Sequence, residues 1–82
     1  MFMETYHLVY PEGETVEIQQ PLRFNSLVDL NGNELQPPLR THRMIVYRVQ
    51  KITRDEGRGE TNHFYHLELV RGEELFGLVG GS

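Results

Sequence analysis

Two strand-like segments in the second half of the chain decide the fold: RMIVYRVQKITR (residues 43–54) and TNHFYHLELV (residues 61–70). Apolar and polar side chains alternate along both segments, which is the pattern of strands that bury one face. The polar residues DEGRGE (55–60) lie between them and include two glycines, which supply the backbone freedom that a turn needs. The pattern predicts a long antiparallel hairpin from Arg43 to Val70.

The alternation assigns one side of this hairpin, called here the inner face, to the core. Three cross-strand pairs keep the apolar side chains together on this face: Val49 with Tyr65, Tyr47 with Leu67, and Ile45 with Leu69. Ile52 stands three positions after Val49, so strict alternation would place it on the wrong face. We therefore expect a β-bulge, one extra residue in the strand, at or next to Gln50.

The opposite side, called here the outer face, combines basic, aromatic and apolar candidates for binding. The basic and aromatic candidates are Arg43, Arg48, Lys51, Arg54, Phe64 and His66, with Arg58 close by in the loop. The apolar candidates form a strip of Met44, Val46 and Val70. An exposed apolar patch usually marks an interface, whereas an aromatic ring among cations on a small β-barrel suits single-stranded nucleic acid.

The charge distribution decides between these two functions. The chain has a net charge of −4, and only residues 40–58 are basic (+4), between the acidic segments 1–39 (−5) and 59–82 (−3). An acidic protein is poorly suited to bind nucleic acid without sequence preference. We therefore expect a non-catalytic interaction or assembly module whose partner is another protein or a second copy of the chain. Nucleic-acid binding is the alternative. A third possibility is that these residues form an ordinary solvated sheet face with no binding function.

The rest of the chain predicts further short strands separated by turns. Candidate strands are 5–10, 15–18, 22–30, 33–36 and 74–79. Pro11 to Glu14 has the composition of a turn, and Asn31-Gly32 predicts a two-residue hairpin turn. No capped segment shows the 3.6-residue apolar period of a helix.

Five to seven short antiparallel strands predict an all-β fold, a small barrel or sandwich of SH3-like or OB-like type without a substantial helix. We expect one domain over residues 1–82, with residues 80–82 as a mobile tail. A chain of 82 residues has room for one core only.

Motifs for catalysis or metal binding are weak in this sequence. Asp29, Asn31 and Asn33 are spaced like the first ligands of a calcium loop, but Glu34 stands where such a loop needs glycine. His63 and His66 are three residues apart, so on a strand they point to opposite faces. We expect no enzymatic activity, no cofactor and no metal site.

Composition also bears on location. The chain has no cysteine, which removes disulfides and fits a reducing compartment. No apolar run reaches the roughly 20 residues of a membrane helix, and the first residues lack the basic region of a secretory signal. We expect a cytoplasmic protein that does not bind membranes.

Overall fold

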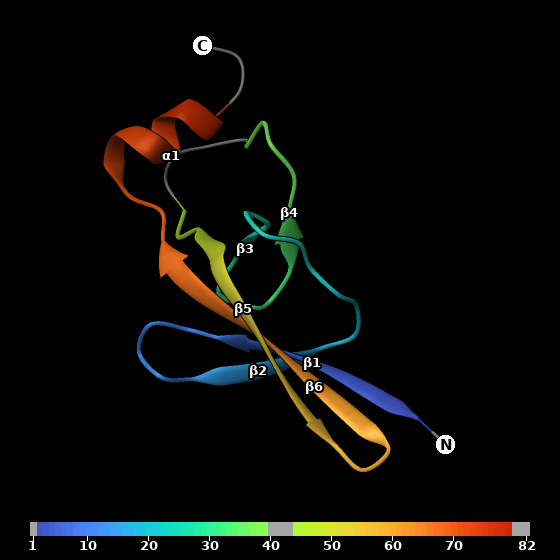
Figure 1. The fold of residues 1–82 in the computed structure, drawn as a ribbon. Coiled ribbons are helices and arrows are strands. Elements are labelled where there is room, and N and C mark those ends of the chain that lie inside the picture. The colour runs from blue at the N-terminus through green and yellow to red at the C-terminus, as the bar shows by residue number, and fades with distance from the viewer. Residues whose placement is uncertain (1, 40–43, 80–82) are drawn as a thin grey trace.

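Six strands and a short helix make up the described part of the structure, a computed structural model that describes residues 2–39 and 44–79. The elements are β1 (Met3–Val9), β2 (Thr15–Ile18), β3 (Leu27–Val28), β4 (Glu34–Leu35), β5 (Tyr47–Gly57), β6 (Glu60–Leu69) and α1 (Gly72–Leu78). The strands form one sheet in the order β2-β1-β6-β5-β3-β4, which curls into a half-barrel (Figure 1). The expected small all-β, barrel-like fold is confirmed.

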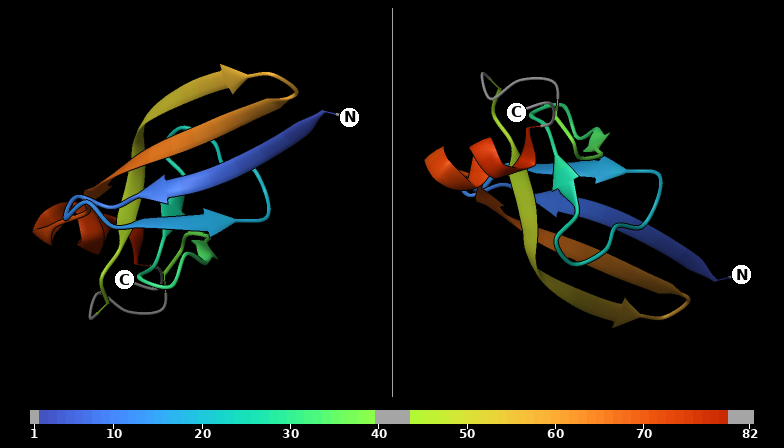
Figure 2. Two further views of the ribbon diagram at one scale, coloured as in Figure 1. Left: turned by 90° about the horizontal axis from the view of Figure 1, so that it is seen from below. Right: turned by 90° about the horizontal axis from the view of Figure 1, so that it is seen from above.

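Strand β1 lies parallel to β6, although the two come from opposite ends of the chain. Their ladder runs from Met3 opposite Glu60 to Val9 opposite His66. On its other side β1 pairs antiparallel with β2, across the turn predicted at Pro11 to Glu14. Strands β1, β6 and β5 form the long centre of the sheet, and Figure 2 shows them extending together away from α1.

The hairpin of β5 and β6 has the predicted bulge but a different register. The ladder shifts between Val49 and Lys51, so Gln50 is the extra residue and the bulge is confirmed. Tyr47 lies opposite Leu69 and Val49 opposite Leu67, two residues away from the expected pairing. The expected register is wrong because the hairpin closes through a tight turn rather than a six-residue loop.

That turn contains only Arg58 and Gly59 between the last pair of the ladder, Gly57 with Glu60. Gly59 has a φ of 72°, a conformation that glycine adopts without steric cost. Asp55 and Glu56 consequently belong to β5 and extend the hairpin. A shift of two residues leaves every side chain on its face, which is why most of the predicted inner face survives.

The first core lies on the inner face. Its buried members are Leu8, Tyr10, Val28, Tyr47, Val49, Tyr65 and Leu67. Two residues assigned to this face are not buried: Ile45 is 48% exposed and Leu69 is 39% exposed. Ile45 precedes β5 and Leu69 ends β6, so both lie at the margin of the sheet and outside the first core.

A second core lies on the outer face at the base of the hairpin. Its buried members are Leu27, Leu39, Val46, Val70 and Leu75. Adjacent residues of β3 show the two sides of the sheet, because Val28 packs in the first core and Leu27 in the second. The expectation of a single core is wrong, since α1 and the segment that ends at Leu39 cover this part of the outer face.

Helix α1 replaces the strand that was expected over residues 74–79. Leu75 and Leu78 are three residues apart, so they share a helix face, and both pack on the second core. Glu73 and Glu74 lie in the first turn, where negative charge favours a helix. Tertiary packing therefore outweighs the poor helix propensity of Gly77.

Two other strands are shorter than expected. Only Leu27–Val28 of the segment 22–30 is a strand, and only Glu34–Leu35 of the segment 33–36. The chain reverses between them through Asp29–Asn33 instead of a two-residue turn. The Asp29 carboxylate accepts hydrogen bonds from the backbone N–H groups of Asn31 (2.8 Å) and Asn33 (2.9 Å), which stabilises the longer loop.

Candidate functional site

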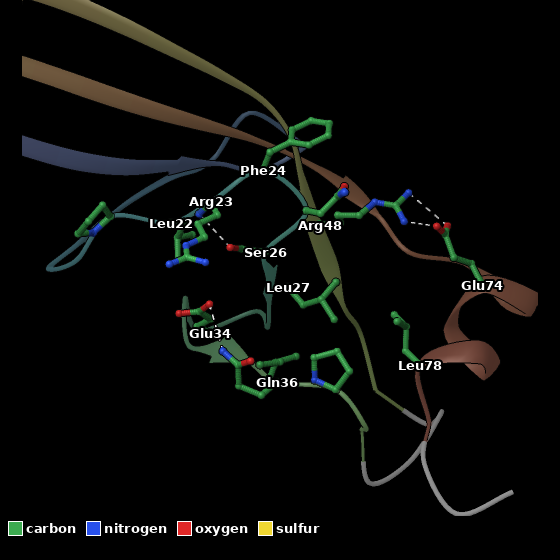
Figure 3. Close-up of a pocket in the computed structure, with 14 residues that line it drawn as sticks. Leu22, Arg23, Phe24, Ser26, Leu27, Glu34, Gln36, Arg48, Glu74 and Leu78 are labelled. Carbon is green, nitrogen blue, oxygen red and sulfur yellow. Dashed lines mark hydrogen bonds and ion pairs between the residues drawn. The ribbon is translucent and has the colours of Figure 1, made fainter.

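A groove of about 750 Å³ opens on the outer face at the base of the hairpin (Figure 3). Four parts of the fold line it: the segment 21–27, the segment 34–37, Arg48 of β5, and α1 through Glu74 and Leu78. We call it the helix groove. Figure 3 shows Phe24 on one side of it and Leu78 on the other.

The floor of the helix groove is the surface of the second core. Leu27 is buried there, and the half-buried Leu35 and Leu78 pack against the same core. Phe24 lies at the rim with 62% of its surface exposed. The groove therefore offers apolar surface to solvent next to a large aromatic side chain.

The loop that carries Phe24 is held by backbone hydrogen bonds. Asn25 N–H donates to the carbonyl of Val49 (3.0 Å), and Val49 N–H donates to the carbonyl of Ser26 (2.9 Å). Asn25 has a φ of 71°, a left-handed conformation in which Asn is among the more common non-glycine residues. Strand β5 thus fixes this loop directly before the bulge.

Arg48 forms the polar wall of the groove and is fully paired. Its Nε donates to Glu68 Oε1 of β6 (3.0 Å), and its terminal nitrogens form ion pairs with Glu68 and with Glu74 of α1. The hydrogen bonds that Arg48 donates to Glu74 and then to Glu68 raise the pKa of Arg48, so the guanidinium stays charged. Two carboxylates neutralise the cation that was expected to lead the basic patch.

The predicted apolar strip does not face solvent. Val46 and Val70 are buried in the second core, and the half-buried Met44 packs against it. The expectation that these three side chains form an exposed strip is wrong, because α1 covers them. Their apolar character belongs to folding at this end of the outer face, and the helix groove lies over the core that they build.

The basic and aromatic candidates are divided among several places. Lys51 and His66 lie opposite each other on the outer face, and Phe64 is on the same face of β6. Arg54 lies opposite His63 on the inner face and forms an ion pair with Glu56 (3.3 Å), so its expected place on the outer face is wrong. Lys51 and Thr53 continue the outer face after the bulge, so alternation places Arg54 on the inner face. Arg43 lies outside the described residues.

The open half of the outer face forms a second candidate surface, called here the arm strip: Thr5, His7, Lys51, Thr53, Phe64 and His66. The His7 and Phe64 rings stack with centroids 5.2 Å apart and an interplanar angle of 21°. His7 Nε2 lies 3.0 Å from Thr5 Oγ1, and His66 Nε2 lies 2.9 Å from Thr53 Oγ1. The strip presents an aromatic pair among hydrogen-bonding side chains.

Two further findings concern metal ions and membranes. Within residues 2–39 and 44–79, no three His, Asp or Glu side chains converge where a metal ion could bind. No helix in that part of the chain is long and apolar enough to cross a membrane.

The helix groove includes residues that the sequence reasoning did not select, chiefly Phe24, Leu27, Leu35 and Leu78. The signal that was available is Phe24 itself, an aromatic residue between the polar residues Arg23 and Asn25. The others became site residues only when α1 packed beside β3 and β4.

The fold and the helix groove together define a small half-barrel β-protein with an apolar groove open to solvent. The chain belongs to the family described as "Uncharacterised Treponema protein", whose model matches residues 2–78. No curated protein and no solved structure matches the chain.

Proposed function

We propose that the protein is a non-catalytic interaction module that binds a partner protein through the helix groove, on the outer face of the hairpin 43–70. The observation that carries this proposal is the exposed Phe24 beside the apolar floor of Leu27, Leu35 and Leu78. Exposed aromatic anchors next to concave apolar surface are the usual centres of binding energy in protein interfaces.

The pairing of the polar side chains in the groove favours a role in binding over one in catalysis. Arg48 is paired with Glu74, and Ser26 Oγ accepts the backbone N–H of Arg23 (2.9 Å). Gln36 Nε2 lies 3.3 Å from Glu34 Oε2. Because these groups already satisfy one another, the groove gains most from a ligand that brings apolar side chains.

The preferred partner is an extended or loop segment with apolar side chains. Opposite charges line the groove, with Arg23 in the segment 21–27 and Glu34 in β4, so strong net charge on the partner has no advantage there. We propose a cytoplasmic setting, which the absence of cysteine suits.

A random peptide library displayed on phage tests the proposal. The protein is immobilised, and enriched peptides are measured against the wild type, Phe24→Ser, and Phe2→Ser as the matched control. Phe2 is 67% exposed and does not line the groove. We expect apolar peptides whose affinity falls about tenfold or more in Phe24→Ser, as for loss of an aromatic anchor, and is unchanged in Phe2→Ser. Peptides that bind Phe24→Ser as tightly as the wild type would overturn it.

Nucleic-acid binding by the arm strip is the second candidate. The stacked rings of His7 and Phe64 beside Lys51 favour it, since bases stack on such surfaces. The net charge of −4 and the neutralised Arg48 speak against it. Fluorescence anisotropy with an oligothymidylate at low salt decides: this candidate requires binding that Phe64→Ala weakens by about 1–3 kcal/mol.

A further inference from the structure

Strand β5 has a free edge beyond the bulge. Strand β3 pairs with β5 only at Tyr47 and Arg48, and the hydrogen bonds from the preceding loop end at Val49. From Lys51 to Gly57, β5 pairs with β6 on one side, and no strand among the described residues pairs with its other side. Both views in Figure 2 show this half of β5 at the margin of the sheet.

A free edge of seven residues is a template for another strand. In an antiparallel ladder alternate residues direct N–H and C=O groups to one neighbour, and the residues between direct theirs to the other side. The outward groups of Lys51 to Gly57 are therefore available for pairing. Which strand fits is decided by the side chains along this edge.

The ladder with β6 assigns these side chains to faces. Lys51, Thr53 and Asp55 lie opposite outer-face residues of β6, and Ile52, Arg54 and Glu56 opposite inner-face residues. Arg54 and Glu56 already pair with each other. Neither Lys51 nor Asp55 has an ion-pair partner among the described residues.

A second copy of β5 brings the unpaired Lys51 and Asp55 opposite each other in one antiparallel register. With Thr53 opposite Thr53 of the other copy, Lys51 faces Asp55 twice, and Ile52 faces the aliphatic stem of Arg54. A register centred on Arg54 places two guanidinium groups opposite each other. One centred on Asp55 places two carboxylates opposite each other, and the Arg54–Glu56 pairs that it forms between copies add little because these side chains already pair within each copy. Opposite charges across a strand pair stabilise it and like charges destabilise it, so the Thr53 register is favoured.

We propose that the chain forms a symmetric dimer in which the β5 edges of two copies pair antiparallel about Thr53. The two sheets then become continuous, and the two arm strips join into one outer surface. The contact is narrow, because it consists of one edge from each copy, so the dimer is weak and depends on concentration. The proposal does not depend on the helix groove, which lies on the other side of the bulge.

Charge exchange across the edge tests the register. Lys51→Asp and Asp55→Lys each place like charges opposite each other in the dimer, and the double variant restores opposite charges. We expect sedimentation velocity at low salt to show a concentration-dependent dimer. Each single variant should weaken it about tenfold or more, and the double variant should recover it. Glu17→Lys is the control for charge, because Glu17 is exposed on β2.

Amide hydrogen exchange locates the contact on the wild-type chain. We expect alternate amides between Lys51 and Gly57 to become protected as the concentration rises, in step with the dimer. A monomer at every concentration would overturn the proposal, as would a dimer that the single variants leave unchanged. A double variant no better than the singles would also overturn it. Phe24→Ser should remain dimeric, so failure of the groove and failure of the edge are distinguishable.

Discussion

Arg48 of β5 forms an ion pair with Glu74 of α1, and this pair connects the helix to the sheet at the helix groove. The same guanidinium contacts Glu68 of β6, so one side chain joins three elements. The arrangement gives Arg48 a structural position in place of the exposed one that its sequence pattern suggested. It also gives the groove a fixed polar wall.

Removing this ion pair should loosen the helix with little loss of global stability. The Arg48 side chain is 24% exposed and that of Glu74 is 49% exposed, so solvent screens much of their attraction. We expect Glu74→Gln to lower the free energy of unfolding by about 0–1 kcal/mol in urea denaturation. Glu73→Gln is the control, because Glu73 forms no ion pair among the described residues. A loss above about 3 kcal/mol would show that the pair is effectively buried.

The neighbouring residues Ile45 and Val46 differ in burial, and the order is the reverse of the one that alternation predicted. Val46 is fully buried in the second core, whereas Ile45 is 48% exposed. We expect Val46→Ala to cost about 2 kcal/mol of stability, from two lost methylene equivalents and a small cavity. Ile45→Ala should cost about 0.5 kcal/mol or less. Thermal denaturation of both variants measures the difference. A larger loss of stability in Ile45→Ala than in Val46→Ala would contradict the burial of Val46 in the second core.

The loop between β3 and β4 should make stability depend on acid. Partial burial alone would raise the pKa of Asp29, but hydrogen bonds from the backbone of Asn33 and Asn31 outweigh it and lower this pKa. A carboxylate with a lowered folded-state pKa stabilises the fold above its unfolded pKa of about 3.9, and this stabilisation is lost as the pH falls.

Asp29→Asn retains a carbonyl oxygen as acceptor but does not titrate. We therefore expect the free energy of unfolding of the wild type to fall more steeply than that of Asp29→Asn when urea denaturation is repeated from pH 5 towards pH 2. Equal slopes would mean that these hydrogen bonds do not favour the ionised form.

The parallel pairing of β1 with β6 should appear as energetic coupling between residues 57 positions apart. His7 and Phe64 lie opposite each other, and their rings stack. A double-mutant cycle with His7→Ala and Phe64→Ala should give a coupling of about 0.5–1.5 kcal/mol in urea denaturation. The control cycle pairs Phe64 with Val16 of β2, which is not its ladder neighbour, and should give none. Equal couplings in the two cycles would contradict the observed register.

Much of the fold could be predicted because strand patterns are local. Alternation along residues 43–70 indicated the long hairpin, and the misplaced Ile52 indicated the bulge at Gln50. Tyr47 and Leu67 were correctly placed in the core. The register was wrong because a two-residue turn and a six-residue loop satisfy the same alternation, and the difference between them preserves every face.

The binding surface was less predictable, because it depends on which elements come together. Lys51, Phe64 and His66 do share the outer face. Phe24 and Leu78 are 54 positions apart and form one groove only when α1 packs beside β3. A short stretch of sequence does not indicate that contact.

The sequence by itself determined that this chain is a small β-protein with a long, bulged hairpin, since period-2 patterning, glycines and prolines act within a few residues. Only the tertiary structure decided the parallel neighbour of β6, the second core and the helix at residues 72–78. The apolar strip of Met44, Val46 and Val70 illustrates the reason. Its pattern shows that these side chains share a face, but whether solvent, a partner or the chain's own helix covers that face depends on long-range packing.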